Sequence, residues 1–395
     1  MNTMTATTTP TAPALPAVPA VDIVHCAVFS AAGQGLESLA AALSGRSAVA
    51  PADPATLPGA DLAGARHPLP VEVRPVAGPQ PADILGRKGL RALTRTDQLA
   101  MAACTVTLDA LDGPGAGVPA DRTGVVLGSS VGSARAWGEF TRDTFVQEAP
   151  YFVNPSHFPG TLMNAAAGRT AIRHGLTGVN ATVSGGPLAA LHAFRYARNT
   201  LLGGHAQRLL TGAVEELSAQ NAWAWHRSGA LKPGIPLGEG GAVFALQPAG
   251  AADDGIRPLA RLLACDTGFA DPARGPLHAA RRLADCVRAA LLRSRVAYED
   301  VAVVAPGAAG RRGWAAVEER ALRTAFAGGA EPCRLAVQPV LGETNSAGGA
   351  LQLAAVLARW QDPAADTEGE RAAVLTSVGA DGSVGCAVVV RPDAG

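Results

Sequence analysis

Short apolar runs, each bounded by glycine, proline or a polar residue, recur along the whole chain. Their length and their valine, isoleucine and leucine content are typical of buried β-strands. Five such runs fall in the first half, at residues 21–30, 123–130, 180–185, 207–216 and 241–248. Five more fall in the second half, at residues 258–269, 300–307, 334–339, 371–380 and 385–392.

Alanine-rich stretches with helical spacing follow most of these runs. Near-continuous apolar strands that alternate with helices indicate sheets covered on both faces, and therefore an α/β fold built in layers. The same order of elements occurs twice, without clear residue-by-residue similarity between the two copies. We therefore expect a tail at 1–20, a first half at 21–250 and a second half at 251–395, joined near 249–258.

Composition excludes several classes of partner. The 33 basic and 33 acidic residues cancel, with no local basic patch, so we expect no nucleic-acid partner. No segment approaches the 18 uninterrupted apolar residues of a membrane span. Residues 1–20 are rich in threonine, alanine and proline without a basic start or an apolar core, which predicts a disordered tail rather than a signal peptide. A cytoplasmic location is the expectation.

The six cysteines are scattered, with no CxxC pair and no histidine cluster beside them: Cys26, Cys104, Cys265, Cys286, Cys333 and Cys386. This spacing signals neither a zinc site nor a disulfide framework. We expect no metal and no cofactor.

The stretch "NATVSGGPLAALHAF", residues 180–194, is a strand that breaks into two glycines and then a helix. Enzymes mount nucleophiles on turns of this kind. Pro187 stands where the nucleophile belongs, and proline has neither a reactive side chain nor a backbone N–H. Proline is also favoured at the start of a helix, which explains it without any chemistry. Ser184 is then a turn residue or, alternatively, a displaced nucleophile.

Two other residues are candidates for chemistry. Ser130 lies in "LGSSVG", a G-x-S-x-G sequence directly after a strand, as in a serine hydrolase. Such an enzyme needs a later aspartate and then a histidine. Histidines do follow Ser130, but none occurs in the last 117 residues, where such a fold usually places its base. The small residues around Ser130 also allow a tight turn. Glu343 lies between a strand and a long apolar helix. It is either a general acid or base or, as we favour, a charge that caps the helix.

Four segments together resemble a β-ketoacyl synthase of the thiolase fold over residues 21–392. They are "VDIVHCAVFSAAGQGLESLAAALSGRSAV", "TRTDQLAMAACTVTLDA", "VNPSHFPGTLMNAAAGRTAIRHGLTGVNATVS" and "LGEGGAVFAL". The resemblance implies two duplicated βαβαβαββ halves that form a layered α-β-α-β-α sandwich.

Condensing enzymes of this family use a cysteine, two histidines and a lysine. In the family's V-S-x-x-C turn, this chain has Pro187 at the cysteine. Pro306 lies at the first histidine, Gln338 at the lysine and Glu343 at the second histidine. The family's G-F-G-G turn is replaced by "SVGADGS". The resemblance therefore implies a catalytic site that has lost all four groups, and with Pro187 one backbone donor of the oxyanion hole.

Within the family, the chain most resembles the chain length factors, the ketosynthase β subunits of type II polyketide synthases. That resemblance implies a heterodimer with a ketosynthase α subunit. The contact between the two subunits would run through the strand at 180–184. An acyl carrier protein delivers malonyl units to such a complex, and the growing chain extends into a tunnel between the subunits. Phe140 and Phe145 are candidates for the tunnel floor, or for ordinary interface packing.

Two alternatives remain open on the sequence alone. One is a thiolase-fold acyltransferase in which Ser184, assisted by Glu343, replaces the cysteine. The other is a serine hydrolase that uses Ser130.

Overall fold

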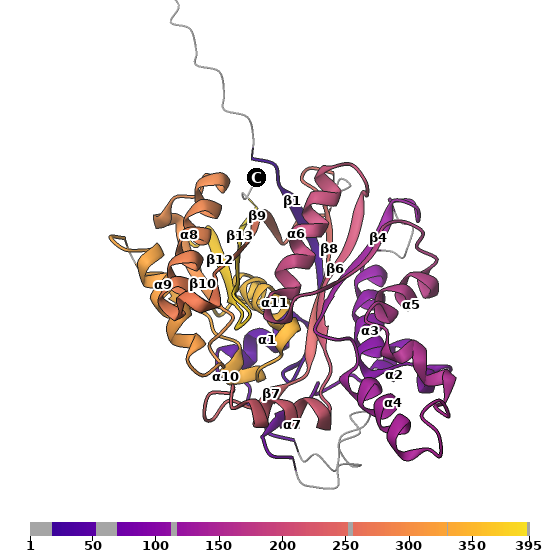
Figure 1. The fold of residues 1–395 in the computed structure, drawn as a ribbon. Helices are drawn as coiled ribbons and strands as arrows, with labels where there is room; N and C mark the ends of the chain where they lie inside the picture. Colours follow the sequence, from indigo (N-terminus) through magenta and orange to yellow (C-terminus); the bar gives the residue numbers. More distant parts are fainter. Residues whose placement is uncertain (1–17, 53–68, 112–116, 252–255, 330, 393–395) are drawn as a thin grey trace, which may run out of the picture.

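The computed structural model describes residues 18–52, 69–111, 117–251, 256–329 and 331–392. In this part of the chain, two groups of strands are separated by central helices and covered by further helices on their outer faces (Figure 1). Most of the predicted tail at 1–20 and part of the predicted joint at 249–258 lie outside the described residues.

The sheet of the first half has the order β5-β4-β6-β8-β1. Its strands are β1 (Val21–Ser30), β4 (Thr123–Ser129), β5 (Asn180–Ser184), β6 (Arg208–Glu215) and β8 (Gly240–Pro248). The sheet of the second half has the order β11-β10-β12-β13-β9. Its strands are β9 (Ala260–Phe269), β10 (Val301–Pro306), β11 (Cys333–Arg334), β12 (Ala372–Val378) and β13 (Ser383–Val390).

Both halves thus place their strands in the same spatial order, which is third, second, fourth, fifth and first along the chain. This common order confirms the predicted duplication. The two half-sheets join where β1 and β9 pair antiparallel over Val21–Ile23 and Ala260–Leu262. Together with the short β2 (Gly33–Gln34) they form one continuous 11-stranded sheet.

The central layer consists of α6 (Ala189–Leu202) and α11 (Gly348–Gln361), which pack between the half-sheets with α1 (Gly35–Leu43) at their side (Figure 1). Nearly every residue of α11 is buried, as expected of a helix that is apolar all round. Phe194 of α6 contacts Phe244 of β8 edge to face, with ring centroids 5.5 Å apart. The main core of the protein therefore joins both halves through these helices.

Two outer helical layers cover the sheet. Helices α3 (Arg95–Asp109) and α5 (Ala165–His174) pack on the first half. Helices α8 (Pro276–Ser294) and α9 (Trp314–Ala325) pack on the second half. The start of α3 is fixed by a capping box, in which Thr94 and Asp97 bond each other's backbone N–H. The predicted α-β-α-β-α sandwich is confirmed.

The remaining elements are short or peripheral. They are α2 (Pro81–Leu85), α4 (Ala134–Val146), α7 (Ala219–Ser228), α10 (Gln338–Leu341) and the strand pair β3 (Val73–Arg74) with β7 (Leu237–Gly238). None of the residues of α4 is buried. No helix in the described ranges has the length and apolar character needed to span a membrane.

Two predicted elements differ from the structure. The strand expected at 334–339 is only two residues long, and Gln338 instead opens α10. Pro339 explains the difference, because proline cannot donate to a strand ladder but is tolerated in the first turn of a helix. The helix expected to start at Pro187 begins at Ala189, after a 3₁₀ turn at Gly186–Leu188.

Candidate functional site

The turn around Pro187 follows the end of β5 and leads into α6. Gly186 has a φ of +50°, a left-handed conformation that glycine adopts without strain. Pro187 sits in the first turn of the 3₁₀ helix, where its missing N–H leaves no bond unmade. Its carbonyl oxygen accepts a hydrogen bond from the Ser377 hydroxyl at 3.0 Å. The turn is therefore tied to β12, in the other half of the protein.

Pro306 ends β10 and lies directly opposite Thr376 in the parallel pairing of β10 with β12. Thr376 is the neighbour in sequence of Ser377, which holds Pro187. Pro187 and Pro306 therefore contact two successive residues of β12. Two positions 119 residues apart in sequence (306 minus 187) meet at the same end of β12.

The side-chain amide of Gln338 is buried beside Pro306. Its Nε2 donates to the carbonyl oxygen of Gly307 at 2.9 Å and lies 3.4 Å from that of Pro306. Its Oε1 has no hydrogen-bond partner. Gln338 thus holds the segment after β10 as a neutral donor, where the family's lysine would carry a positive charge.

Glu343 is 1 % exposed and forms a bidentate ion pair with Arg311. The Oε1–Nη2 distance is 2.9 Å and the Oε2–Nε distance is 3.2 Å. Glu343 also accepts the backbone N–H of Asn345, where the chain turns toward α11, at 2.8 Å. The predicted capping role is therefore present, but no sequence pattern indicated that Arg311, 32 residues earlier, is the main partner.

Gly310 shows how closely Gln338 and Glu343 approach. A Cβ atom at Gly310 would lie 3.2 Å from both the Cβ of Gln338 and Oε2 of Glu343. The four predicted positions thus belong to one contact network, which runs from Pro187 through β12 to Pro306, Gln338 and Glu343. The network supplies two side chains without polar atoms, one neutral amide and one carboxylate neutralised by an arginine.

Glu318 is a buried carboxylate next to this network, and the sequence did not single it out as a candidate. Glu318 of α9 accepts the backbone N–H groups of Gly307 and Ala308 at 3.0 and 2.7 Å, and the Thr376 hydroxyl at 2.8 Å. Burial raises the pKa of Glu318 to about 7. Because Glu318 already takes both N–H groups, neither is available to bind an oxyanion.

A cavity of about 570 Å³ opens beside Pro306 and is lined by Arg311, Glu318 and Glu319 as well. Pro187, Gln338 and Glu343 do not line it. The cavity is therefore next to the contact network, and of the four positions Pro306 alone lines it.

The two serine candidates have structural partners. The Ser184 hydroxyl donates to the carbonyl oxygen of Ser130 at 2.8 Å, and the Ser130 hydroxyl donates to Oε1 of Glu215 at 2.7 Å. Ser184 is not hydrogen-bonded to Glu343, whose carboxylate is held by Arg311. Neither hydroxyl bonds a histidine within the residues that the structure describes. The contacts required by the relocated nucleophile and by the hydrolase are not formed.

Glu215, at the end of β6, is itself notable. Ser346, just before α11, bonds its other oxygen through both the backbone N–H, at 3.3 Å, and the hydroxyl. Burial raises the pKa of Glu215 to about 7, against the opposing effect of these hydrogen bonds. The carboxyl group therefore links the first half to the second half.

The structure places both tunnel candidates on α4, but on different faces, because five residues along a helix turn the side chain by about 140°. The Phe140 ring lies 6.1 Å from the Phe158 ring between centroids. Phe145 is 82 % exposed. Their role in a tunnel remains a prediction.

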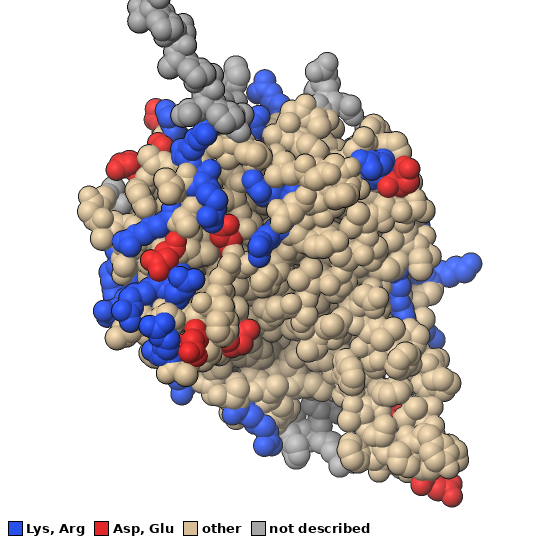
Figure 2. Space-filling view, turned by 45° about the horizontal axis from the view of Figure 1, so that its top comes forward, with Lys and Arg blue, Asp and Glu red and all other residues tan. Residues whose placement is uncertain are grey.

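Around α4, the surface from residue 131 to 172 is rich in exposed apolar side chains. We call this the 131–172 surface. Its members are Val131, Trp137, Phe145, Val146, Tyr151, Phe152, Phe158, Leu162, Met163 and Ile172. It adjoins β5, which is the last strand at its edge of the sheet. Figure 2 shows few charged residues over much of the first half, whereas basic residues gather on the side of α8 and α9.

Comparisons with known proteins agree with this architecture. Residues 20–251 match the family model described as "Beta-ketoacyl synthase, N-terminal domain". The 3-oxoacyl-[acyl-carrier-protein] synthase 2 of Vibrio harveyi is 29% identical over 139 residues, which cover 34% of this chain and 32% of that protein. The match thus spans about a third of the curated relative's length.

Solved structures match over almost the whole chain. The ishigamide ketosynthase/chain length factor has 31% sequence identity and a TM-score of 0.78, over 94% of this chain and 99% of that chain. A beta-ketoacyl synthase from Burkholderia phymatum STM815 has 19% identity and the same TM-score of 0.78, over 94% and 99%. The second likeness concerns the fold alone.

The duplicated five-stranded halves and the central helix pair are those of a thiolase-like ketosynthase. The family match covers more than half of the chain, so this protein belongs to the beta-ketoacyl synthase family.

Proposed function

We propose that this chain is a non-catalytic, ketosynthase-like subunit of a type II polyketide synthase, a chain length factor. The observation that carries the proposal is the network of Pro187, Pro306, Gln338 and Glu343. A condensing enzyme needs a thiolate to attack the acyl thioester and basic groups to activate it. None of these four side chains is a thiol, an imidazole or an amine.

The hydrogen bonds around the network also argue against residual chemistry. The one carboxylate at the four positions is fixed by Arg311 and the Asn345 N–H. The nearby N–H groups of Gly307 and Ala308 are occupied by Glu318. A site that has lost its reactive groups, and whose buried carboxylates are held by hydrogen bonds, acts as a rigid support.

The proposed partner is a catalytic ketosynthase subunit, paired through β5 and the 131–172 surface. An edge strand offers unpaired backbone groups to a second strand, and exposed apolar patches of this extent mark interaction sites. The solved relative named ketosynthase/chain length factor supports such a pairing. Joining two such subunits would cover Phe145, which is largely exposed in the single chain.

The proposed task of the chain is to shape the tunnel in which the partner extends a polyketide. A reactive poly-β-keto chain is protected when it is enclosed away from water, and the depth of the enclosure limits its length. Phe140 and Phe145 are the proposed floor residues. In one solved structure of this fold, at 14% identity, a type II polyketide synthase acyl-carrier protein is in complex with its ketosynthase bound to the hexaketide. We propose that a carrier protein serves this chain's complex in the same manner.

The experiment that tests this function is co-expression with a catalytic ketosynthase subunit of a type II polyketide synthase. The isolated chain should show no condensation with malonyl-loaded carrier protein, and the pair should co-purify and make a product of defined length. A Ser184→Ala or Ser130→Ala variant should leave that product unchanged. Loss of product in either variant would instead favour one of the serine alternatives.

A further inference from the structure

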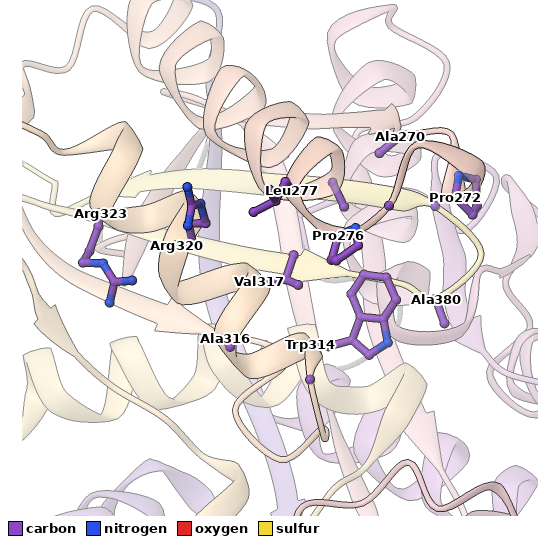
Figure 3. A pocket seen from close by; sticks show the side chains of 14 residues that line it. Ala270, Pro272, Pro276, Leu277, Trp314, Ala316, Val317, Arg320, Arg323 and Ala380 are labelled. Atoms are coloured by element: carbon purple, nitrogen blue, oxygen red, sulfur yellow. The ribbon is translucent and has the colours of Figure 1, made fainter.

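A second cavity, of about 650 Å³, lies on the outer face of the second half. It shares Gly313 and Ala316 with the cavity beside Pro306, but none of the four network positions lines it. It opens between the first turn of α8 and helix α9, and the loop between β12 and β13 closes one end (Figure 3). Its volume is within the range typical of sites for small molecules. Nothing in the proposed function uses it.

The two ends of this cavity differ in character. The indole of Trp314 and the small side chain of Ala380 lie at one end, and Leu277 and Val317 lie between the ends (Figure 3). The guanidinium groups of Arg320 and Arg323 lie at the other end (Figure 3). The cavity is thus apolar along most of its length and cationic at one terminus.

The two arginines are free to bind a ligand. They are three residues apart on α9 and therefore project from the same face of the helix. Both are exposed, and neither has an ion-pair or side-chain hydrogen-bond partner within the described ranges. The carboxylates of α9 do not compete, because Glu319 pairs with Arg334 and Glu318 is buried against β12.

No carboxylate lines the cavity. Asp271 and Asp381 are next to lining residues, but each bonds its own loop. Asp271 accepts the Ala273 N–H at 3.0 Å, and Asp381 accepts the Ser383 hydroxyl at 2.6 Å. Neither carboxylate lines the cavity, and Figure 2 shows basic residues gathered on this side of the molecule.

We propose that this cavity binds an amphipathic anion, an apolar carbon chain that ends in a carboxylate or a phosphate. The anionic group pairs with Arg320 and Arg323, as guanidinium forks do with both kinds of group. The chain lies along Leu277 and Val317 and ends against Trp314. The proposal is independent of the chain length function, since it uses neither the network nor the 131–172 surface.

The test is isothermal titration of the full chain, alone or in the complex in which it is purified, with three probes of equal chain length. Decanoate and decyl phosphate should bind saturably, and the tighter of the two identifies the head group. Decanol, which lacks the charge, should bind at least about tenfold more weakly, because a pair of charge-assisted bonds contributes well over 1.4 kcal/mol. Equal binding of decanol would overturn the proposal.

Three variants distinguish binding in this cavity from nonspecific attraction of anions to the arginine-rich side of the protein. The double variant Arg320→Ala/Arg323→Ala should weaken anion binding at least about tenfold. Arg371→Ala, which removes an exposed arginine at the opposite end of β12, should change nothing. Val317→Trp fills the cavity while it keeps both arginines, and it should also abolish binding. Wild-type affinity in the arginine double variant, or no saturable binding of either anion, would contradict the proposal.

Discussion

Arg311 and Glu343 form a buried bidentate ion pair. The family resemblance places Glu343 at the position of a catalytic histidine, and we propose that the pair gives this position a structural role. Removal of one partner leaves the other charge buried and uncompensated, which typically costs 3–5 kcal/mol. We therefore expect Arg311→Met to lower the free energy of unfolding by about 3 kcal/mol or more.

Chemical denaturation of the purified chain measures this effect. The double variant Arg311→Met/Glu343→Met serves as the control and should recover much of the loss, because no lone charge remains. If Arg311→Met changes the free energy of unfolding by less than about 0.5 kcal/mol, as surface substitutions do, the ion pair is not the structural element that we describe.

Restoring a thiol at Pro187 should not restore condensation. Pro187→Cys supplies the nucleophile and the missing N–H, but Pro306, Gln338 and Glu343 still provide no base. The measurement is product formation by a complex whose catalytic subunit has had its own nucleophilic cysteine replaced by alanine. We expect no product above background. The same variant beside an intact catalytic subunit should remain productive, and product in the first complex would show that the site retains activity.

The floor residues should control product length. Phe140→Ala and Phe145→Ala each remove a ring from the proposed tunnel, so the complex should make longer chains. Phe269→Ala, which removes an exposed ring at the end of β9, is the matched control and should leave the lengths unchanged. Mass spectrometry of the products gives the answer. Unchanged lengths in both α4 variants would dismiss these two residues as the floor.

The 131–172 surface should be required for pairing. Ile172 is 83 % exposed on α5, so Ile172→Asp should leave the fold intact but place a charge in the interface. Leu292, 81 % exposed on α8, offers a matched control in Leu292→Asp. We expect co-purification of the catalytic subunit to be lost in the first variant and kept in the second. The opposite result would move the interface to the second half.

Glu215 should make stability depend on pH. Its pKa is raised from 4.5 to about 7 by burial, so the folded protein binds a proton more tightly than the unfolded chain does. The contribution of Glu215 to stability is then fully present below pH 4.5 and is lost as pH rises to about 7.

Glu215→Gln removes this titration, so its stability relative to wild type should rise between pH 5 and 8, by up to about 3 kcal/mol. The Ser346 hydroxyl, 3.2 Å from the Val214 carbonyl oxygen, can turn to suit a neutral side chain. Denaturation at several pH values measures the difference. Glu299→Gln, an exposed control, should show none of this dependence. A difference that is constant with pH would place the Glu215 pKa near its ordinary value.

Much of the fold was predictable from apolar patterning, because buried strands such as Val21–Ser30 are mostly apolar. The strand expected at 334–339 failed because its composition suits a strand, whereas Pro339 suits a helix start. Local composition cannot decide between a strand and a helix start at 334–339. The segment lies at the edge of the sheet, where only two residues pair with β10.

The family pattern proposed the positions of the candidate site, which stay a prediction, but it could not propose their contacts. The ion pair between Arg311 and Glu343 and the bonds of Glu318 join residues that are distant in sequence, and only packing brings them together. The "GRRGW" stretch offered two adjacent arginines with no periodic signal to show which one is buried. Buried polar contacts of this kind follow from tertiary structure.

The most direct test of the central claim compares the products of the catalytic ketosynthase subunit with and without this chain. Both samples receive the same carrier protein and malonyl donor, and chain lengths are resolved by mass spectrometry. We predict that the subunit alone makes little product or a mixture of lengths, and that adding this chain gives one defined length. If the catalytic subunit alone makes the same product at the same rate, the chain does not set polyketide length.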